Sequence, residues 1–455
     1  MNDKTVKFID LFAGLGGIRL GFEQACKEKG LKSKCVLTSE IKNSAIKTYK
    51  HNFPNGIVEG DIYKIKNDDV PEFDFMLAGF PCQPFSSGGK RHGFADTRGT
   101  LFFEIERFLR AKKPEGFILE NVEGLVKHDL QNKSDKLGNT LKTILYKLET
   151  ELHYKVSWKV LDSSNFGVPQ SRKRIYIVGT KNNFIDLENY IPRSENLEGI
   201  LEHGLEVINS DFTKKLFHFF TKEQLLGKSI KDKRGGENNI HSWDLELKGE
   251  CSIEQKILLN QIYKQRRRKQ WAEEIGIDWM DGMPLTKKQI STFYSEDNLF
   301  ETRNLQELLD DLVNKGYLRY EHPKKLIKIQ TPNGEQSNRA YDDSKPKGYN
   351  IVTGKLSFEI NKILNPKNVA PTLVATDMSK IVVPDENGLR RITKREGLRL
   401  FGFPEDYTIQ VDEAKTFDLL GNSVVVPVIK AIAESILDVV SEKYIHTEQL
   451  KELIA

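Results

Sequence analysis

Thr-Val-Lys-Phe-Ile-Asp-Leu-Phe-Ala-Gly-Leu-Gly-Gly, residues 5–17, is the stretch that decides the fold of this chain. Residues 5–11 are rich in β-branched and aromatic side chains, which favours a strand. After the glycines, Ile18, Phe22 and Ala25 repeat with helical spacing until Gly30 ends the pattern. Strand, glycine turn and helix open a doubly wound α/β domain, in which the glycines let the backbone approach a ligand closely.

The spacing of these glycines differs from the dinucleotide fingerprint. Arg19 stands where a third glycine would pack the helix against the strand. This difference argues against a nicotinamide-dependent oxidoreductase. Taken alone, the turn is as compatible with a plain tight turn as with a ligand site.

Acidic residues follow the next two predicted strands, 34–39 and 57–59. Glu40 comes directly after the first of them and Asp61 shortly after the second. Both carboxylates are expected at the sheet edge that carries the glycine turn, where they could accept hydrogen bonds from ribose hydroxyls and an adenine amine. The alternative is that each caps the helix that follows it.

A single cysteine lies between two prolines in Gly-Phe-Pro-Cys-Gln-Pro-Phe-Ser, residues 79–86. An apolar strand, 75–78, precedes it and a glycine-rich polar run, 87–93, follows it. A lone cysteine is most often packed and inert. Here the prolines fix the backbone on both sides, so we expect Cys82 on a rigid corner that faces a loop, which suits a nucleophile.

Three charged residues belong to the later strands. The predicted strand 116–119 ends at Glu120, and the strand 174–179 is entered through Arg172 and Arg174. The two arginines occupy alternate positions and should therefore point to the same side. An amphipathic helix, 137–152, is expected between these strands.

Composition limits the remaining possibilities. The 455 residues are 38% hydrophobic and carry a formal charge of +4, so a polyanionic partner would be bound by a local patch. The four cysteines form no CxxC pair, which argues against zinc and against a disulfide framework. No apolar signal or membrane-spanning stretch is found. We expect a folded protein of a reducing cytoplasm, and no metal.

The α/β pattern is lost between about residues 182 and 368. A basic run, 263–271, contains Arg266, Arg267 and Arg268 and is predicted as helical, either as a solvated face or as a phosphate contact. The order of helices and short strands over 255–325 is compatible with a helical insertion of the winged-helix type, without excluding another arrangement. Regular structure is expected again over 369–376, and an apolar C-terminal helix, 424–440, should cover a sheet.

With these residues in place, the chain resembles a C5-cytosine DNA methyltransferase of the bacterial restriction-modification type. Six matches occur in the order of that family: residues 8–17, 79–86, Glu120-Asn121-Val122, Gln170-x-Arg172-x-Arg174, 395–404 and Gly421-Asn422-Ser423. The resemblance implies an S-adenosylmethionine-dependent, Rossmann-like catalytic domain, 1–181 completed by 405–455. It also implies a smaller mixed target-recognition domain, 182–404.

The resemblance implies the chemistry as well. Cys82 would add to C6 of a flipped-out cytosine, Glu120 would contact N3 and the exocyclic amine, and Arg174 beside Arg172 would bind O2. The methyl group would come from S-adenosylmethionine, leaving S-adenosylhomocysteine. The residues implied for cofactor binding are Phe12, Gly14, Leu15, Gly16, Glu40, Asp61, Pro81, Leu101, Asn422 and Ser423.

Double-stranded DNA is the partner that the resemblance implies. The residues expected to contact it are Gln83, Ser86, Lys90, Arg91, Thr372 and Leu373, together with the run Arg266, Arg267 and Arg268. The resemblance also implies a cognate restriction endonuclease, a monomeric state, no membrane, and a location in a prokaryotic cytoplasm in association with the nucleoid. Two alternatives stay open: a tRNA cytosine-5 methyltransferase, and a non-catalytic DNA-binding protein with the same fold.

Overall fold

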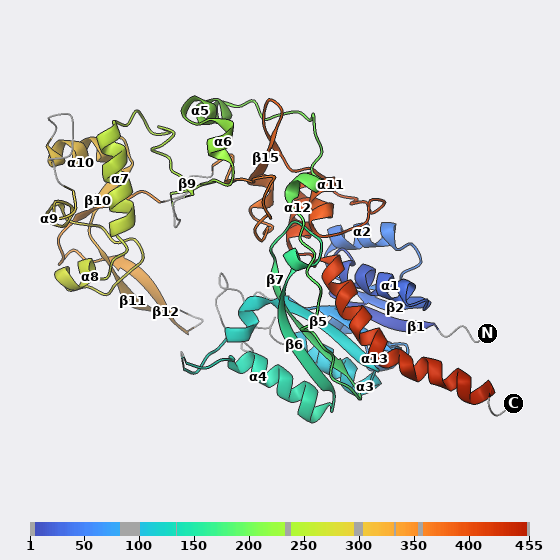
Figure 1. Cartoon of the computed structure of the whole chain (residues 1–455). Coiled ribbons are helices and arrows are strands. Elements are labelled where there is room, and N and C mark those ends of the chain that lie inside the picture. Colours follow the sequence, from blue (N-terminus) through green and yellow to red (C-terminus); the bar gives the residue numbers. More distant parts are fainter. Residues whose placement is uncertain are drawn as a thin grey trace. The chain divides into compact units, whose positions relative to one another are not determined.

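The computed structural model describes residues 5–81, 101–132, 134–232, 238–294, 304–331, 334–353 and 358–452. The chain forms two compact units (Figure 1). The first comprises Met1–Glu206, Asn365–Glu386 and Arg390–Ala455. The second comprises Val207–Leu364 and Asn387–Leu389.

These boundaries differ from the predicted small domain, 182–404. Residues 182–206 and 390–404 belong to the first unit, and a buried network explains why. Arg390 donates to Glu396 through both terminal nitrogens, at 2.6 and 2.9 Å, and also to the backbone carbonyl of Glu202. Because a buried guanidinium needs its partners close by, these segments fold together.

The first unit is built on one seven-stranded sheet with the order β3-β2-β1-β4-β5-β7-β6. Its strands are β1 (Val6–Leu11), β2 (Ser33–Ser39), β3 (Val58–Glu59), β4 (Phe75–Gly79), β5 (Gly116–Val122), β6 (Lys155–Asp162) and β7 (Lys173–Thr180). The strands β1 to β5 are mutually parallel, whereas β7 is antiparallel to β5 and β6. The predicted α/β class is confirmed.

Helices cover both faces of this sheet. The helices of the first unit are α1 (Gly17–Glu28), α2 (Asn43–Asn52), α3 (Leu101–Lys112), α4 (Asn139–Tyr146), α11 (Lys394–Leu400), α12 (Glu413–Gly421) and α13 (Val426–Glu452). Side chains of α3 and α4 share one apolar core with Ile9, Met76 and Leu119 of the strands. On the other face, Phe22 of α1 packs between Phe8 and Phe75. The alternation of strand side chains separates these two cores.

The C-terminal helix, which was predicted to cover a sheet, packs along α1 (Figure 1). Two glycines of α1 allow this close approach. A Cβ added at Gly17 would lie 2.8 Å from Val424, and one added at Gly21 would lie 2.7 Å from Ile429. A larger side chain at either position would push the helices apart. The two ends of the chain therefore form one structural unit.

The second unit has its own apolar core. Its elements are α5 (Asp211–Phe219), α6 (Lys222–Leu225), β8 (Ser229–Ile230), β9 (Asn239–Ile240), α7 (Ile253–Gln265), α8 (Gln270–Ile275), α9 (Lys287–Ile290), α10 (Leu305–Asn314), β10 (Leu318–Glu321), β11 (Lys324–Thr331), β12 (Gly334–Tyr341), β13 (Gly348–Ile351) and β14 (Lys362–Ile363). Leu258, Trp271 and Leu309 meet in the core of helices α7 to α10. The expected order of helices followed by strands is found.

Two segments differ from their predicted structure. Residues 369–376 contain no strand beyond an isolated bridge between Ala370 and Gln170, because this segment pairs with a loop. The predicted helix 137–152 forms α4, which is followed directly by a π-helical turn, Lys147–Glu151. The strands β15 (Ile381–Asp385) and β16 (Gly388–Arg391) follow residues 369–376. No helix among the described residues is long and apolar enough to cross a membrane.

Candidate active site

The glycine turn lies at the carboxyl end of β1. Phe12, Gly14 and Gly16 all adopt positive φ, at 56°, 54° and 75°. A Cβ at Gly16 would lie 2.5 Å from the ring of Phe53, whereas one at Gly14 would meet nothing within 4 Å. The backbone at Gly14 therefore faces open space at the sheet edge, as a turn that receives a ligand must. Leu15 is buried, and its carbonyl accepts a hydrogen bond from Tyr407.

Asp61 caps the short helix that follows it, which was the alternative interpretation of these acids, whereas Glu40 binds backbone N–H groups without capping α2. One Glu40 oxygen accepts from the backbone N–H of Gly14 at 2.8 Å, and the other accepts from the N–H groups of Ile41 and Lys42. Asp61 accepts from the N–H of Tyr63 at 3.1 Å. A carboxylate offers roughly four acceptor positions. These hydrogen bonds leave acceptor positions for a ligand on both carboxylates. The predicted contacts of Glu40 and Asp61 with a ligand stay a prediction.

The strand β4 leads directly into the cysteine segment. Asn121, which is 1% exposed, donates from Nδ2 to the carbonyl of Phe80 at 3.3 Å. Pro81 is half-buried, as is Leu101 at the start of α3. Asn121 thus fixes the point at which the chain enters the predicted nucleophile segment. The residues Cys82, Gln83, Ser86, Lys90 and Arg91 lie outside the described residues.

Glu120 and Arg174 form an ion pair between β5 and β7. The Arg174 Nε lies 3.1 Å from a Glu120 carboxylate oxygen, and both side chains are largely buried. The register pairs Val122 with Arg174 and Glu120 with Tyr176, so the two charged residues are diagonal neighbours on one face. Glu120 lies within β5 rather than beyond its end, because β7 extends the ladder by these residues.

Burial raises the pKa of the Glu120 carboxyl, and the guanidinium groups of Arg174 and Arg172 oppose that rise. A raised pKa increases the fraction of protonated carboxyl near neutral pH. Such a group can donate a proton to a ring nitrogen. The adjacent Arg174 can stabilise negative charge that develops on a substrate oxygen.

Arg172 has different partners from those predicted. It is 3% exposed and donates to three backbone carbonyls: Leu373 at 3.1 Å, and Gly421 and Ser423 at 3.0 Å each. Burial and the nearby Arg174 lower its pKa. Its hydrogen bonds join the start of β7 to two distant loops. Arg172 is therefore better described as a positioning residue than as a substrate contact.

Asn422 and Ser423 lie on one of these loops, directly after α12. Asn422 is exposed and donates to the carbonyl of Asp418 at 2.8 Å, while Ser423 is buried. A Cβ at Gly421 would lie 2.2 Å from the backbone nitrogen of Ala375. Only glycine fits at this crossing, so the two loops that Arg172 binds also pack tightly against each other.

The pair Thr372 and Leu373, predicted to contact DNA, has two different environments. The Thr372 hydroxyl donates to the carbonyl of Ser171 at 2.8 Å, and the residue is exposed. Leu373 is 1% exposed, so its side chain is part of the core and does not contact a partner. Only Thr372 of this pair stays a candidate contact.

The structure also corrects the prediction for the basic run, residues 263–271, of the second unit. The helix α7 ends at Gln265, and Arg266 is 4% exposed and donates to Asn350 at 2.8 Å. Arg267 pairs with Asp281, with Nε 3.2 Å from the carboxylate. Arg268 is exposed. The run does not form a row of phosphate contacts, because its first arginine is inside the protein.

Two positioning residues have no role assigned by sequence reasoning, although both stand in the matched motifs. Asn121 is one, through its bond to Phe80. Gln170 is the other: it is fully buried, donates to the carbonyl of Leu400 at 3.0 Å and accepts from the N–H of Leu373. Their only sequence signal is the fixed spacing from Glu120 and Arg172. Among the described residues, no three of His, Cys, Asp or Glu gather as metal ligands would.

Comparison with known proteins agrees with this geometry. Residues 6–438 match the family model of C-5 cytosine-specific DNA methylases. The chain is 57% identical to the Type II methyltransferase M.NlaIV of Neisseria lactamica over 95% of this chain and 99% of that protein. It is 42% identical to M.BanI of Aneurinibacillus aneurinilyticus over 95% of each chain.

A solved structure shares the fold. The methyltransferase EhMeth of Entamoeba histolytica superimposes with a TM-score of 0.50 at 16% identity, covering 96% of this chain and 98% of that one. At this identity the likeness concerns the fold, and the family follows from the match along the sequence. The chain belongs to the C-5 cytosine-specific DNA methylase family and is a DNA cytosine methyltransferase.

Proposed function

We propose that the enzyme methylates C5 of a flipped-out cytosine through a covalent adduct between Cys82 and C6 of the base. Cytosine C5 is a poor nucleophile until a thiolate adds at C6. Glu120 donates a proton to N3 as Cys82 adds, and Arg174 binds O2 and stabilises the adduct. C5 then takes the methyl group, loses its proton, and Cys82 is eliminated. The single observation that supports this best is the buried Glu120–Arg174 pair, with the pKa of Glu120 raised.

S-adenosylmethionine supplies an electrophilic methyl group when it is bound. The open space at Gly14 fits such a ligand, since the backbone there faces the sheet edge with no side chain in the way. The cofactor contacts that we propose are Phe12, Gly14, Leu15, Gly16, Glu40, Asp61, Pro81, Leu101, Asn422 and Ser423. Arg172 and Gln170 act through these loops by holding their backbones.

For the DNA, we propose that residues 207–364 carry target recognition and that the segment after Cys82 contacts the flipped site. Gln83, Ser86, Lys90, Arg91 and Thr372 are the candidate contacts. Base flipping costs about a few kcal/mol, which binding of the duplex must offset. The relatives are named Type II methyltransferases, which supports a role in protecting host DNA from a cognate endonuclease.

The test is labelled-methyl transfer to mixed-sequence duplex DNA, followed by bisulfite sequencing to locate the modified base. We expect 5-methylcytosine at one position of a short specific site. Glu120→Gln should lower kcat by about 10²- to 10⁴-fold, the usual contribution of general acid catalysis. Glu123→Gln, an exposed carboxylate three residues later, is the matched control and should leave the rate unchanged.

Two outcomes would refute the proposal. Transfer to tRNA with none to DNA would favour the tRNA alternative. DNA binding without any methyl transfer, in an enzyme that still binds S-adenosylmethionine, would favour the non-catalytic alternative.

A further inference from the structure

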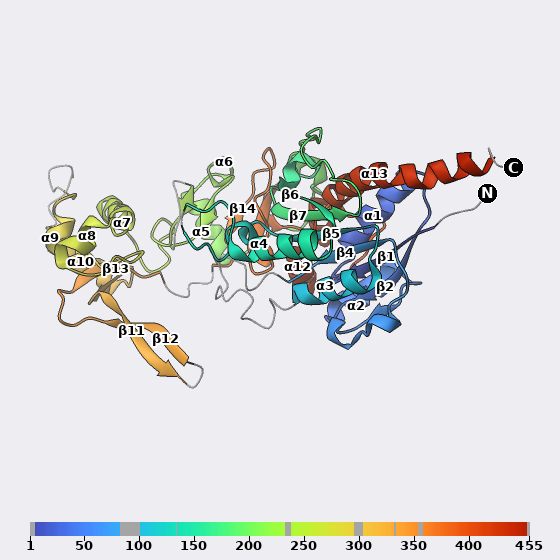
Figure 2. The ribbon, with the colours of Figure 1, turned by 90° about the horizontal axis from the view of Figure 1, so that it is seen from below.

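A long β-ribbon projects from the helices of the second unit. Its strands β11 and β12 pair in antiparallel register over eight residue pairs, from Lys324–Tyr341 to Thr331–Gly334. Figure 2 shows the ribbon extending away from α8 and α10. None of residues 324–329 and 338–341 is buried. A two-stranded ribbon without a covering layer is marginally stable in water, so folding of the core does not explain its length.

One face of the ribbon combines cations with exposed apolar side chains. Residues opposite each other in the register project to the same face, which places Lys324, Leu326, Lys328, Arg339 and Tyr341 together. Leu326 is 60% exposed and Tyr341 is 50% exposed. The Lys324 ammonium lies 4.9 Å from the centre of the Tyr341 ring. The register continues this basic face through the pairs Lys328–Ser337 and Gln330–Glu335, so the face has three cationic positions and one acidic position.

The base of the ribbon is fixed to its unit. The Tyr341 hydroxyl donates to Glu321 at 2.9 Å, and Asn350 donates to the other oxygen of the same carboxylate at 2.8 Å. Lys325 pairs with Asp342 at 3.1 Å. Because these three side-chain interactions anchor its base, the ribbon is held in one direction rather than hanging as a free hairpin.

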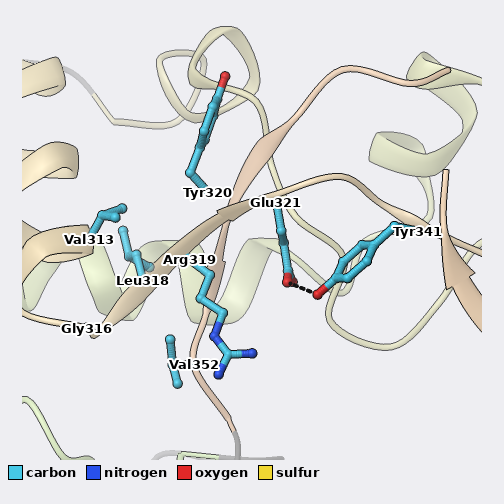
Figure 3. A pocket seen from close by; sticks show the side chains of 8 residues that line it. All are labelled: Val313, Gly316, Leu318, Arg319, Tyr320, Glu321, Tyr341 and Val352. Carbon is cyan, nitrogen blue, oxygen red and sulfur yellow. Dashed lines mark hydrogen bonds between the residues drawn. The ribbon is translucent and has the colours of Figure 1, made fainter. Parts of the chain in front are cut away.

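A pocket of about 510 Å³ lies beside this base. Figure 3 shows Arg319 reaching along it toward Val352, and the bond between Tyr341 and Glu321 at its edge. Arg319 thus adds a further cation near the ribbon. Over residues 315–349 the sequence has eight Lys and Arg residues and four Asp and Glu residues, a net charge of +4 that equals that of the whole chain.

We infer that the basic face of the ribbon binds duplex DNA. A major groove about 12 Å wide admits a two-stranded ribbon. Lys324, Lys328 and Arg339 can neutralise phosphates or bond base edges, while Leu326 offers an apolar surface for a thymine methyl group. The inference rests on the proposed function, which makes DNA the substrate, and adds where that DNA is bound.

Lysines on exposed strands can also serve only to prevent edge-to-edge association. That role does not explain why Leu326 and Tyr341 are exposed on the same face as the cations, since exposed apolar side chains would promote association. A polyanion with apolar groups in its groove complements both features. A second copy of this chain carries the same positive face and would be repelled.

The test measures DNA affinity against salt concentration for the full-length enzyme. The ribbon variant is Lys328→Gln with Arg339→Gln. The matched control is Lys264→Gln with Arg268→Gln, which removes two exposed cations at the end of α7 in the same unit. We expect the slope of log affinity against log salt to fall, in the ribbon variant only, by about 0.9 for each phosphate that is no longer neutralised.

A wild-type slope in the ribbon variant would refute the inference, and a reduced slope in the control alone would assign the DNA-binding surface to α7 instead. A ribbon variant that changes the sedimentation of the DNA-free enzyme would favour a second copy as the occupant. These results are separate from the proposed function. If the wild-type enzyme methylates DNA, a failed ribbon test overturns the ribbon alone; if it methylates no DNA, the proposed function itself fails.

Discussion

Arg172 offers the sharpest test of how the site is assembled. Replacement by methionine keeps much of the side-chain volume and removes the donors to Leu373, Gly421 and Ser423. Each charge-assisted hydrogen bond contributes about 1.5–3 kcal/mol. Removing the buried charge offsets part of that sum, because burial disfavours the charged guanidinium. We expect a net loss of about 2–4 kcal/mol in the free energy of unfolding.

The functional effect should be on cofactor binding rather than on chemistry. Loss of about 1.4–2.8 kcal/mol of loop ordering corresponds to a 10- to 100-fold weaker affinity for S-adenosylmethionine. Arg172→Met should therefore raise KM for the cofactor with little change in kcat, and Arg172→Lys should recover part of the loss. Arg174→Met should instead lower kcat. Lys173→Met, an exposed neighbour between them, is the control.

The assays are urea unfolding, calorimetric titration with S-adenosylhomocysteine and steady-state kinetics. If Arg172→Met lowers kcat as strongly as Arg174→Met while cofactor affinity is unchanged, Arg172 is a catalytic residue and the positioning role is wrong.

Two further predictions concern buried charge. Burial raises the pKa of the Asp10 carboxyl to about 7, although Tyr49 donates a hydrogen bond to it. Because the same carboxyl titrates near 3.9 in the unfolded chain, its contribution to the free energy of unfolding is fully present below about pH 3.9 and is lost as the pH rises to about 7. Asp10→Asn should therefore gain up to about 4 kcal/mol on the wild type at pH 8 but not at pH 4, measured by urea unfolding, and a difference independent of pH would contradict this. Glu396→Gln breaks the network that Glu396 forms with Arg390 and Asp385, whose side chains are at most 2% exposed. It should lower the free energy of unfolding by about 3–5 kcal/mol, as measured by urea unfolding. A decrease below about 1 kcal/mol would show that the network is not coupled.

The sequence predicted the first unit well because its signals are local. The central strands β4 and β5 contain continuous apolar runs, β1 is rich in β-branched and aromatic residues, and the glycine turn and Glu120 directly follow such runs. The C-terminal helix was predicted to cover the sheet because it is apolar and needs a partner. The glycines of α1 that receive it could not be assigned that role from their own neighbourhood.

Other features depend on interactions between residues far apart in the chain. Arg172 and Arg174 look alike in sequence, yet Arg172 bonds carbonyls about 250 positions away while Arg174 pairs with Glu120. The run Arg266 to Arg268 reads as uniformly basic, but burial against Asn350 removes Arg266 from the surface. The sequence of β11, Lys-Lys-Leu-Ile-Lys-Ile-Gln-Thr, does not tell which face of the ribbon is left open.

The most direct test of the central claim is to trap the reaction on a duplex target containing 5-fluorocytosine and to map the protein–DNA adduct by mass spectrometry. The fluorine replaces the proton that must leave C5, so the covalent complex should accumulate after methyl transfer. We predict an adduct on the peptide that contains Cys82, with the methyl group on C5, and none in Cys82→Ser. An adduct on another residue, or one that still forms in Cys82→Ser, would contradict the account.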